Sequence, residues 1–143
     1  MKIENQVCPF EHAKRLKKLG VMQKSLHYYC EEFGVVTKTR SGFAIVEPRR
    51  QDAPDLLKED ITLNEYYAAF TVAELGIALP YSINSAAMII ENGNDIKYVS
   101  YPRIKTTFGT TEAQARANML IWLLDNKYIT ADEVNRRVGE QVK

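Results

Sequence analysis

The stretch from residue 112 to 126 constrains the fold most, because its apolar side chains recur at helical spacing on two sides at once. At 100° per residue, one surface carries Ala113, Ala117, Leu120, Ile121 and Leu124. The second surface carries Ala115, Met119, Trp122 and Leu123. A helix that is apolar on two sides must lie at the centre of a core or be covered by a partner. Both explanations stay open at this point.

Two further segments carry start and stop signals for helices. The first begins near Pro9, which suits the first helical turn, and ends at Gly20, which suits the position just past a helix. The second begins at Thr71, where a threonine followed three residues later by Glu74 makes a capping box, and Pro80 stops it. We expect a short helix over residues 72–79.

Capping signals also mark the last two helices. Thr111 with Gln114 makes a capping box in front of the central helix. Thr130 caps a last short helix, which we expect to end in Arg136-Arg137.

Two hairpins lie between these helices. Residues 35–39 and 43–47 are rich in β-branched and apolar residues and are joined by a short turn that contains glycine. Residues 88–91 and 96–101 form a second pair across Asn92-Gly93-Asn94-Asp95. Residues 49–62 are polar and punctuated by proline, so we expect a loop there. The pattern predicts an α+β fold with an antiparallel sheet of two hairpins packed against about four helices.

Length and composition predict a single globular domain over residues 1–143. Hydrophobic residues make up 45% of the chain, so a core can form without disulfides or structural metals. The N-terminus opens no apolar segment typical of a signal peptide, and the longest apolar run, residues 119–124, is too short to span a membrane. We expect a cytoplasmic protein without membrane contact.

Charge is distributed unevenly along the chain. Residues 1–50 hold ten Lys and Arg against five Asp and Glu, a net of +5, whereas the net charge of the whole chain is +1. Lys14, Arg15 and Lys18 share one side of the first helix and make a candidate nucleic-acid-binding surface. The alternative is the ordinary solvated face of an amphipathic helix.

All cysteines and histidines lie between residues 8 and 30. Cys8, His12, His27 and Cys30 have the chemistry of a tetrahedral zinc site, and a cysteine beside a histidine can also serve as a nucleophile. The spacing contains no CxxC pair, and the chain carries no recognisable catalytic motif. The alternative is that both cysteines are buried in the core and both histidines have no special role. Because the zinc and catalytic patterns are missing, we expect no cofactor and no enzymatic activity.

The second apolar surface of the central helix offers a candidate protein interface. Met119 and Trp122 lie at its centre, and both residue types are enriched in interface cores. The partner can be another protein or a second copy of the chain. The alternative is that the fold itself covers this surface.

Parts of the chain resemble a group of small uncharacterised proteins from phage and prophage regions of gut-type bacteria. The resemblance is carried by residues 8–21 with Tyr28-Tyr29, and by residues 71–80 and 113–124. It implies a phage-related role in a bacterial cytoplasm, and it carries no catalytic or binding residues over to this chain.

These observations lead to an ordered set of hypotheses for function. The first is a non-enzymatic phage or prophage accessory protein that acts through protein–protein contacts. The alternatives are a nucleic-acid-binding module that uses the first helix, and a zinc-binding or thiol enzyme.

Overall fold

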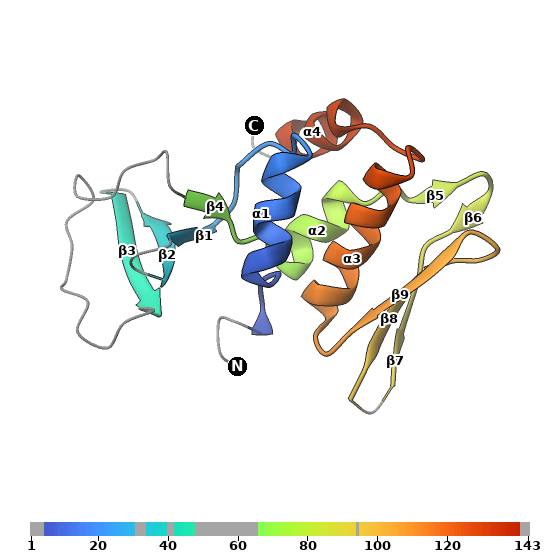
Figure 1. The fold of residues 1–143 in the computed structure, drawn as a ribbon, viewed down its shortest axis with the longest axis horizontal. Helices are drawn as coiled ribbons and strands as arrows, with labels where there is room; N and C mark the ends of the chain where they lie inside the picture. The colour runs from blue at the N-terminus through green and yellow to red at the C-terminus, as the bar shows by residue number, and fades with distance from the viewer. Residues whose placement is uncertain (1–4, 31–33, 40–41, 48–65, 94, 141–143) are drawn as a thin grey trace.

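The computed structural model describes residues 5–30, 34–39, 42–47, 66–93 and 95–140 (Figure 1). The helices are α1 (Phe10–Lys18), α2 (Val72–Ala78), α3 (Glu112–Asp125) and α4 (Ala131–Glu140). The strands are β1 (His27–Cys30), β2 (Gly34–Thr39), β3 (Gly42–Glu47), β4 (Tyr66–Ala68), β5 (Ser82–Ile83), β6 (Ala86–Ala87), β7 (Ile89–Asn92), β8 (Lys97–Tyr101) and β9 (Lys105–Gly109).

The predicted α+β class is confirmed: the described residues form four helices and three antiparallel sheets. The strand orders are β3-β2-β1-β4, β5-β6 and β7-β8-β9. The two predicted hairpins form, but they belong to separate sheets rather than to one. Strands β4 and β9, which the sequence did not predict, extend the two larger sheets. The predicted loop at residues 49–62 lies outside the described residues.

Helix α3 lies at the centre of the fold, as one explanation of its two apolar surfaces required. It contacts β8 and β9 on one side and α1 and α2 on the other, as Figure 1 shows. The buried side chains of α3 are Ala113, Ala115, Ala117, Met119, Leu120 and Leu123. The predicted capping box in front of α3 forms only in half. Thr111 accepts from the Gln114 N–H, but the Gln114 side chain accepts from the N–H of Thr110 instead.

Helix α1 ends as its glycine predicted. Gly20 has φ +93°, the Gly20 N–H donates to the Lys17 carbonyl, and the Val21 N–H donates to the Leu16 carbonyl. This pair of bonds is the Schellman motif, which satisfies carbonyl groups left without partners at a helix end. The motif turns the chain away so that α4 can pack nearby, where Asn135 accepts from the Met22 N–H.

The predicted capping box of α2 is complete and also organises a neighbouring segment. Thr71 Oγ1 accepts from the Glu74 N–H, and Glu74 accepts from the Thr71 N–H. The same carboxylate accepts from Ser25 Oγ at 2.6 Å and from the Leu26 N–H at 3.0 Å. Glu74 therefore fixes the entry into β1 as well as the start of α2.

The last helix is longer than predicted. Thr130 caps it, but the helix passes Arg136-Arg137 and runs to Glu140. The Arg137 side chain donates to the Ala78 carbonyl at the end of α2. Nothing in the described part of the chain is a helix long and apolar enough to cross a membrane.

Candidate functional site

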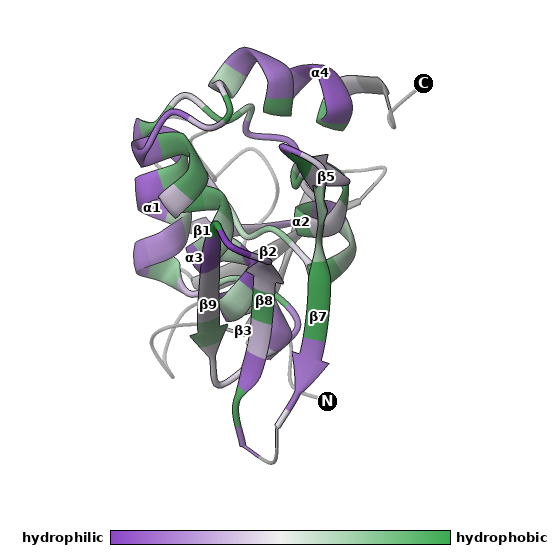
Figure 2. Ribbon diagram, turned by 90° about the vertical axis from the view of Figure 1, so that its right-hand side faces the viewer, coloured by the Kyte–Doolittle hydropathy of each residue, from purple (hydrophilic) through white to green (hydrophobic). Residues whose placement is uncertain are grey.

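The β7-β8-β9 sheet has one face against α3 and one face turned away from it. On the inner side Val99 and Thr107 are buried, and Thr107 Oγ1 donates to the Ala115 carbonyl at 2.9 Å. Because side chains alternate along a strand, the neighbouring positions point outward. We call these positions the outer sheet face: Ile89, Glu91, Tyr98, Ser100, Thr106 and Phe108. Figure 2 shows the sheet in front of the helices.

The outer sheet face is more apolar than the solvated side of a sheet needs to be. An antiparallel sheet with one face on the core usually carries polar residues on the other. Here Phe108 is 62% exposed and Ile89 is 41% exposed. Tyr98 lies opposite Phe108 in the register, and their ring centroids are 6.4 Å apart. Tyr98 and Phe108 therefore form an aromatic pair, and Ile89 lies on the same face, opposite Ser100. Exposed apolar side chains grouped on one face are typical of interaction surfaces.

The structure separates the two residues of the predicted interface. Met119 is fully buried in the core, so the fold itself covers it. Trp122 is partly exposed and stacks on Tyr128 at a centroid distance of 5.3 Å, while Lys105 Nζ lies 5.4 Å from its ring. A helical projection of the sequence cannot tell which of two apolar surfaces the rest of the chain covers.

The basic side of α1 borders a shallow pocket of about 450 Å³. Its lining residues are Glu11, Lys14, Arg15, Lys17, Lys18 and Tyr67. We call Lys14, Lys17 and Lys18 the lysine surface. The pocket gathers four cations and one carboxylate, a local net charge of +3, because the opposite side of α1 buries Ala13 and Leu16.

The cations that line this pocket contact different kinds of groups. Arg15 pairs with Asp125 of α3 at 2.7 Å, which offsets its charge. Lys14 Nζ lies 5.2 Å from the ring centroid of Phe10, and Lys17 Nζ lies 4.8 Å from that of Tyr67. Cation–π contacts keep a full positive charge while limiting the positions of the ammonium group.

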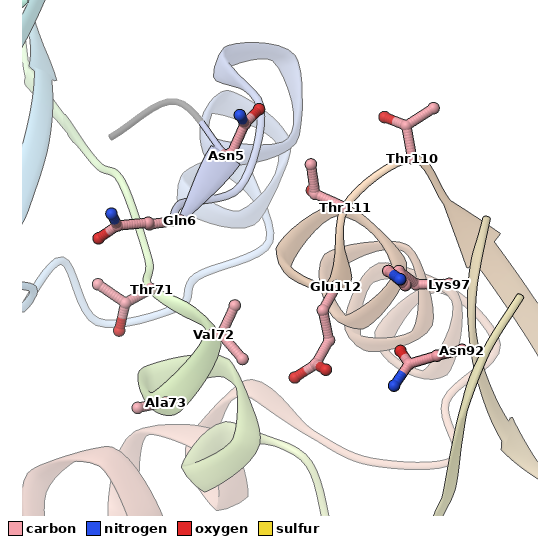
Figure 3. A pocket seen from close by; sticks show the side chains of 10 residues that line it. All are labelled: Asn5, Gln6, Thr71, Val72, Ala73, Asn92, Lys97, Thr110, Thr111 and Glu112. Carbon is pink, nitrogen blue, oxygen red and sulfur yellow. The ribbon is translucent and has the colours of Figure 1, made fainter. Parts of the chain in front are cut away.

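A larger pocket of about 760 Å³ lies where the N-terminal ends of α2 and α3 approach β7 and β8 (Figure 3). Its lining residues are Asn5, Gln6, Thr71, Val72, Ala73, Asn92, Lys97, Thr110, Thr111 and Glu112. Some of the polar groups here have partners within the protein. The Val72 N–H donates to the Gln6 carbonyl, and Glu112 pairs with Arg116 at 2.9 Å. Lys97 and Glu112 carry opposite charges, so the lining selects no charge class of ligand.

Cys8 is a buried thiol rather than a reactive one. It has no exposed surface, its N–H donates to the Phe70 carbonyl, and its own carbonyl accepts from the Tyr29 hydroxyl. Burial raises the pKa of the thiol to about 12. Since the thiolate is the nucleophile and the metal ligand, this environment suits neither role at neutral pH.

The described residues do not bring Cys8 and the two histidines together as one metal site. His12 Nε2 lies 2.5 Å from Asn118 Oδ1, and burial lowers the pKa of His27 while the charge of Glu74 opposes that shift. Cys30 ends β1, and its side chain lies outside the described part of the structure. Among the described residues, no three side chains of His, Cys, Asp or Glu gather as a metal site would require.

Sequence reasoning did not predict the outer sheet face, and it missed Lys17 and Tyr67 of the pocket beside α1. Phe108 lies on β9, where the run Thr106-Thr107 was the available strand signal. Lys17 stands three residues after Lys14, so a wider helical arc would have included it. Tyr67 had no local signal, because it reaches α1 only through the pairing of β4 with β1.

The chain was also compared with known proteins. No protein-family model, curated protein or solved structure matches it. The roles proposed below therefore depend on the geometry of the chain itself.

Proposed function

We propose that this chain is a phage- or prophage-type accessory protein that binds a partner protein in the cytoplasm rather than catalysing a reaction. The observation that supports this proposal best is the group of exposed apolar side chains on the outer sheet face, which we call the apolar patch. Phe108 and Ile89 are exposed there, and Tyr98 joins Phe108 across the strands. The phage or prophage setting is part of the proposal and comes only from the resemblance described in the sequence analysis.

The size of the outer sheet face favours a short segment as its occupant. Three strands about 4.8 Å apart, over about four residues of 3.3 Å, give a face of roughly 200 Å². A stable protein–protein interface buries about 800 Å² on each partner. A second copy packed on this face alone would bury too little area to form a stable dimer.

Charge indicates the chemistry of that segment. Glu91 lies opposite Tyr98 on the outer sheet face and is exposed, and Asp95 is exposed in the turn that follows β7. A segment with apolar side chains and one Lys or Arg would cover the patch and pair with Glu91. The occupant we propose is such an apolar and basic segment of another protein.

The test selects ligands from a library of 12-residue peptides and measures their affinities by fluorescence anisotropy. We expect selected peptides to combine apolar residues with a basic one, and their binding to shift the amide resonances of β7, β8 and β9. Ile89→Thr with Phe108→Thr places a residue of high strand propensity at both positions and should weaken binding at least tenfold. Leu26→Thr removes an exposed apolar side chain away from this sheet and is the matched control.

The alternative outcomes are distinct. If Glu91→Gln leaves the affinity unchanged, the basic residue of the segment has no role and that part of the proposal fails. If the double variant binds as well as the native chain, the outer sheet face is not the site. If sedimentation shows a dimer that Phe108→Thr dissociates, the occupant is a second copy and not a segment of another protein.

A further inference from the structure

We propose that a segment of the partner protein adds to the β7-β8-β9 sheet as a fourth strand, along the free edge of β7. The strand order leaves two edges, β7 and β9, and Figure 2 shows β7 at the right-hand border of the sheet. This inference rests on the proposed function, because it concerns the same apolar and basic segment. It adds how the backbone of that segment is held.

Two residues of β7 have backbone groups that face away from β8. The Gly93 N–H donates to the Ile96 carbonyl at 2.8 Å. In an antiparallel ladder, pairs that exchange hydrogen bonds alternate with pairs that do not. Counting back from Gly93 along the register, Asn92 and Ile90 occupy the positions without ladder bonds. Their N–H and carbonyl groups therefore point out of the sheet edge.

The same alternation holds at the start of β7 and sets the length of the free edge. The Met88 N–H donates to the Tyr81 carbonyl at 3.1 Å, so Met88 also faces outward and its N–H has a partner. Among the described residues, none hydrogen-bonds to the outward groups of Ile90 and Asn92. Two N–H groups and two carbonyl groups are thus available to an added strand over residues 89–93.

The other edge of the sheet is already partly covered by α3. At β9 the Phe108 carbonyl accepts from Asn118 Nδ2 at 2.8 Å. A Cβ at Gly109 would lie 2.8 Å from the Ala115 backbone nitrogen, so β9 and α3 are in close contact there. Strand addition is therefore favoured at β7.

The charge of Glu91 favours a basic segment over a second copy of the chain. If two copies paired antiparallel through Ile90 and Asn92, Glu91 would lie directly opposite its own copy, about 4.5 Å away between Cα atoms. Like charges at such positions destabilise a strand pair, whereas a Lys or Arg opposite Glu91 would stabilise it. Glu91 thus opposes self-association at the edge and selects the partner segment.

The pocket of about 760 Å³ lies beside this edge, on the side of the sheet that faces the helices. Asn92 lines it from β7, and Val72 and Thr111 line it from the starts of α2 and α3 (Figure 3). Because side chains alternate along a strand, the residue opposite Glu91 points to the outer side and its two neighbours point inward. One of these neighbours would lie beside Asn92 and the pocket, and the other beside Ile90.

These positions define the sequence that we expect in the segment. The hydroxyl and amide groups of the pocket suit an uncharged polar side chain, and Ile90 suits an apolar one. In antiparallel pairing, which is slightly the more stable arrangement, the segment then reads uncharged polar, basic, apolar from its N-terminus. The next residue would lie opposite Ile89 on the outer sheet face, where an apolar side chain begins to cover the apolar patch.

The experiment methylates the backbone nitrogens of the selected peptides one at a time and measures their affinity for the native chain by fluorescence anisotropy. A methyl group removes the N–H donor. We expect losses of about tenfold or more at two alternate positions, and of less than about twofold at the position between them. On binding, hydrogen exchange at the Ile90 and Asn92 amides should slow about tenfold or more, whereas the Thr106 amide at the β9 edge should not change.

A matched pair of variants tests the same contact from the side of the protein. Ile90→Pro removes an outward N–H and no bond of the β7–β8 ladder, which is the arrangement in which strands tolerate proline. We expect it to weaken binding about tenfold, and Ile90→Val, which keeps the N–H, to change the affinity less than about twofold. Circular dichroism checks folding; if Ile90→Pro does not fold, the methylated peptides still test the inference on the native chain.

The outcomes separate the inference from the proposed function. If peptides bind without an alternating effect of methylation, and exchange at Ile90 and Asn92 is unchanged, the added strand is wrong and the proposed function stands. If no peptide binds, both fail. An alternating effect with full binding by the Ile89→Thr, Phe108→Thr variant would support the added strand and show that the outer sheet face is not the site. Slower exchange at Ile90 and Asn92 when the chain is concentrated without peptide would identify a second copy as the occupant and overturn the inference.

Discussion

Asn118 of α3 holds His12 of α1 through a hydrogen bond of 2.5 Å between Nε2 and Oδ1. The Asn118 amide nitrogen donates to the Phe108 carbonyl at 2.8 Å, which leaves its oxygen for the imidazole. Since that oxygen can only accept, His12 Nε2 carries the hydrogen. One asparagine thus links the helix of the lysine surface to a strand of the outer sheet face.

Replacing Asn118 should lower the stability of the protein, because two groups on different elements would lose their hydrogen-bond partner. Asn118→Ala leaves the His12 Nε2 hydrogen and the Phe108 carbonyl without their partner, and we expect the free energy of unfolding to fall by about 1–3 kcal/mol. Urea denaturation measures the change. Asn126→Ala is the matched control, because Asn126 is exposed and bonds only within its own helix end; we expect a change of about 0.5 kcal/mol or less. Equal losses in the two variants would contradict a linking role.

Two glycines should respond to alanine in opposite directions. A Cβ at Gly109 would lie 2.8 Å from the Ala115 backbone nitrogen, whereas a Cβ at Gly139 in α4 would meet nothing within 4 Å. We expect Gly109→Ala to destabilise the protein by about 1–3 kcal/mol through overpacking. Gly139→Ala should stabilise it by about 0.5–1 kcal/mol, because alanine is the better helix former. The measurement is the Tm from thermal unfolding. If Gly109→Ala left Tm unchanged, the close packing of β9 on α3 at this position would be contradicted.

The thiol of Cys8 should be almost inert in the folded protein. A Cys30→Ala background leaves Cys8 as the sole thiol of the chain. With the side chain fully buried and its pKa raised to about 12, labelling by a chromogenic disulfide at pH 8 should be at least about 100-fold slower than in denaturant. Rapid labelling without denaturant would show an accessible thiol and return the thiol-enzyme hypothesis to consideration.

Stability should fall in alkaline solution. Burial raises the pKa of Cys8 from 9.0 to about 12 and that of Tyr101 from 10.0 to about 12. Between pH 9 and 12 the unfolded chain therefore releases these protons first, and the free energy of unfolding decreases as pH rises.

Tyr101→Phe isolates the contribution of the phenol. The variant also loses the hydrogen bond from the Tyr101 hydroxyl to the Pro80 carbonyl, so it starts less stable. Its urea midpoint should then decline less steeply than that of the native chain from pH 10 to 11. Parallel declines would mean that this phenol does not contribute to the pH dependence.

The sequence predicted the elements that have local signals. The capping box of Thr71 and Glu74 located α2, and the turn residues between Asn92 and Asp95 located the β7–β8 hairpin. The three-residue strand β4 was missed because its place depends on pairing with β1, about 40 residues earlier in the chain. Helical spacing predicted that α3 needs cover on two sides, but only the packed structure shows that Met119 is inside.

The candidate surfaces, like the elements, could be predicted only where a local pattern exists. Helical spacing predicted that Lys14, Arg15 and Lys18 share one side of a helix. The ion pair that offsets the charge of Arg15 could not be predicted, because it depends on the packing of α1 against α3, which carries Asp125. The outer sheet face was not predicted, because its most exposed apolar residue, Phe108, comes from a strand that the hairpin pattern did not include.

The central place of α3 has a consequence for how the chain folds during synthesis. Helix α1 is made first, but its contacts with α3 join residues about 100 positions apart. At translation rates of about 5–20 residues per second, the part of α1 that contacts α3 waits about 5–20 s for that helix, although β4 can cover another part of α1 earlier. During that interval the uncovered part of α1 is exposed to chaperones and to other nascent chains. The core around α1 is complete only after α3 has left the ribosome.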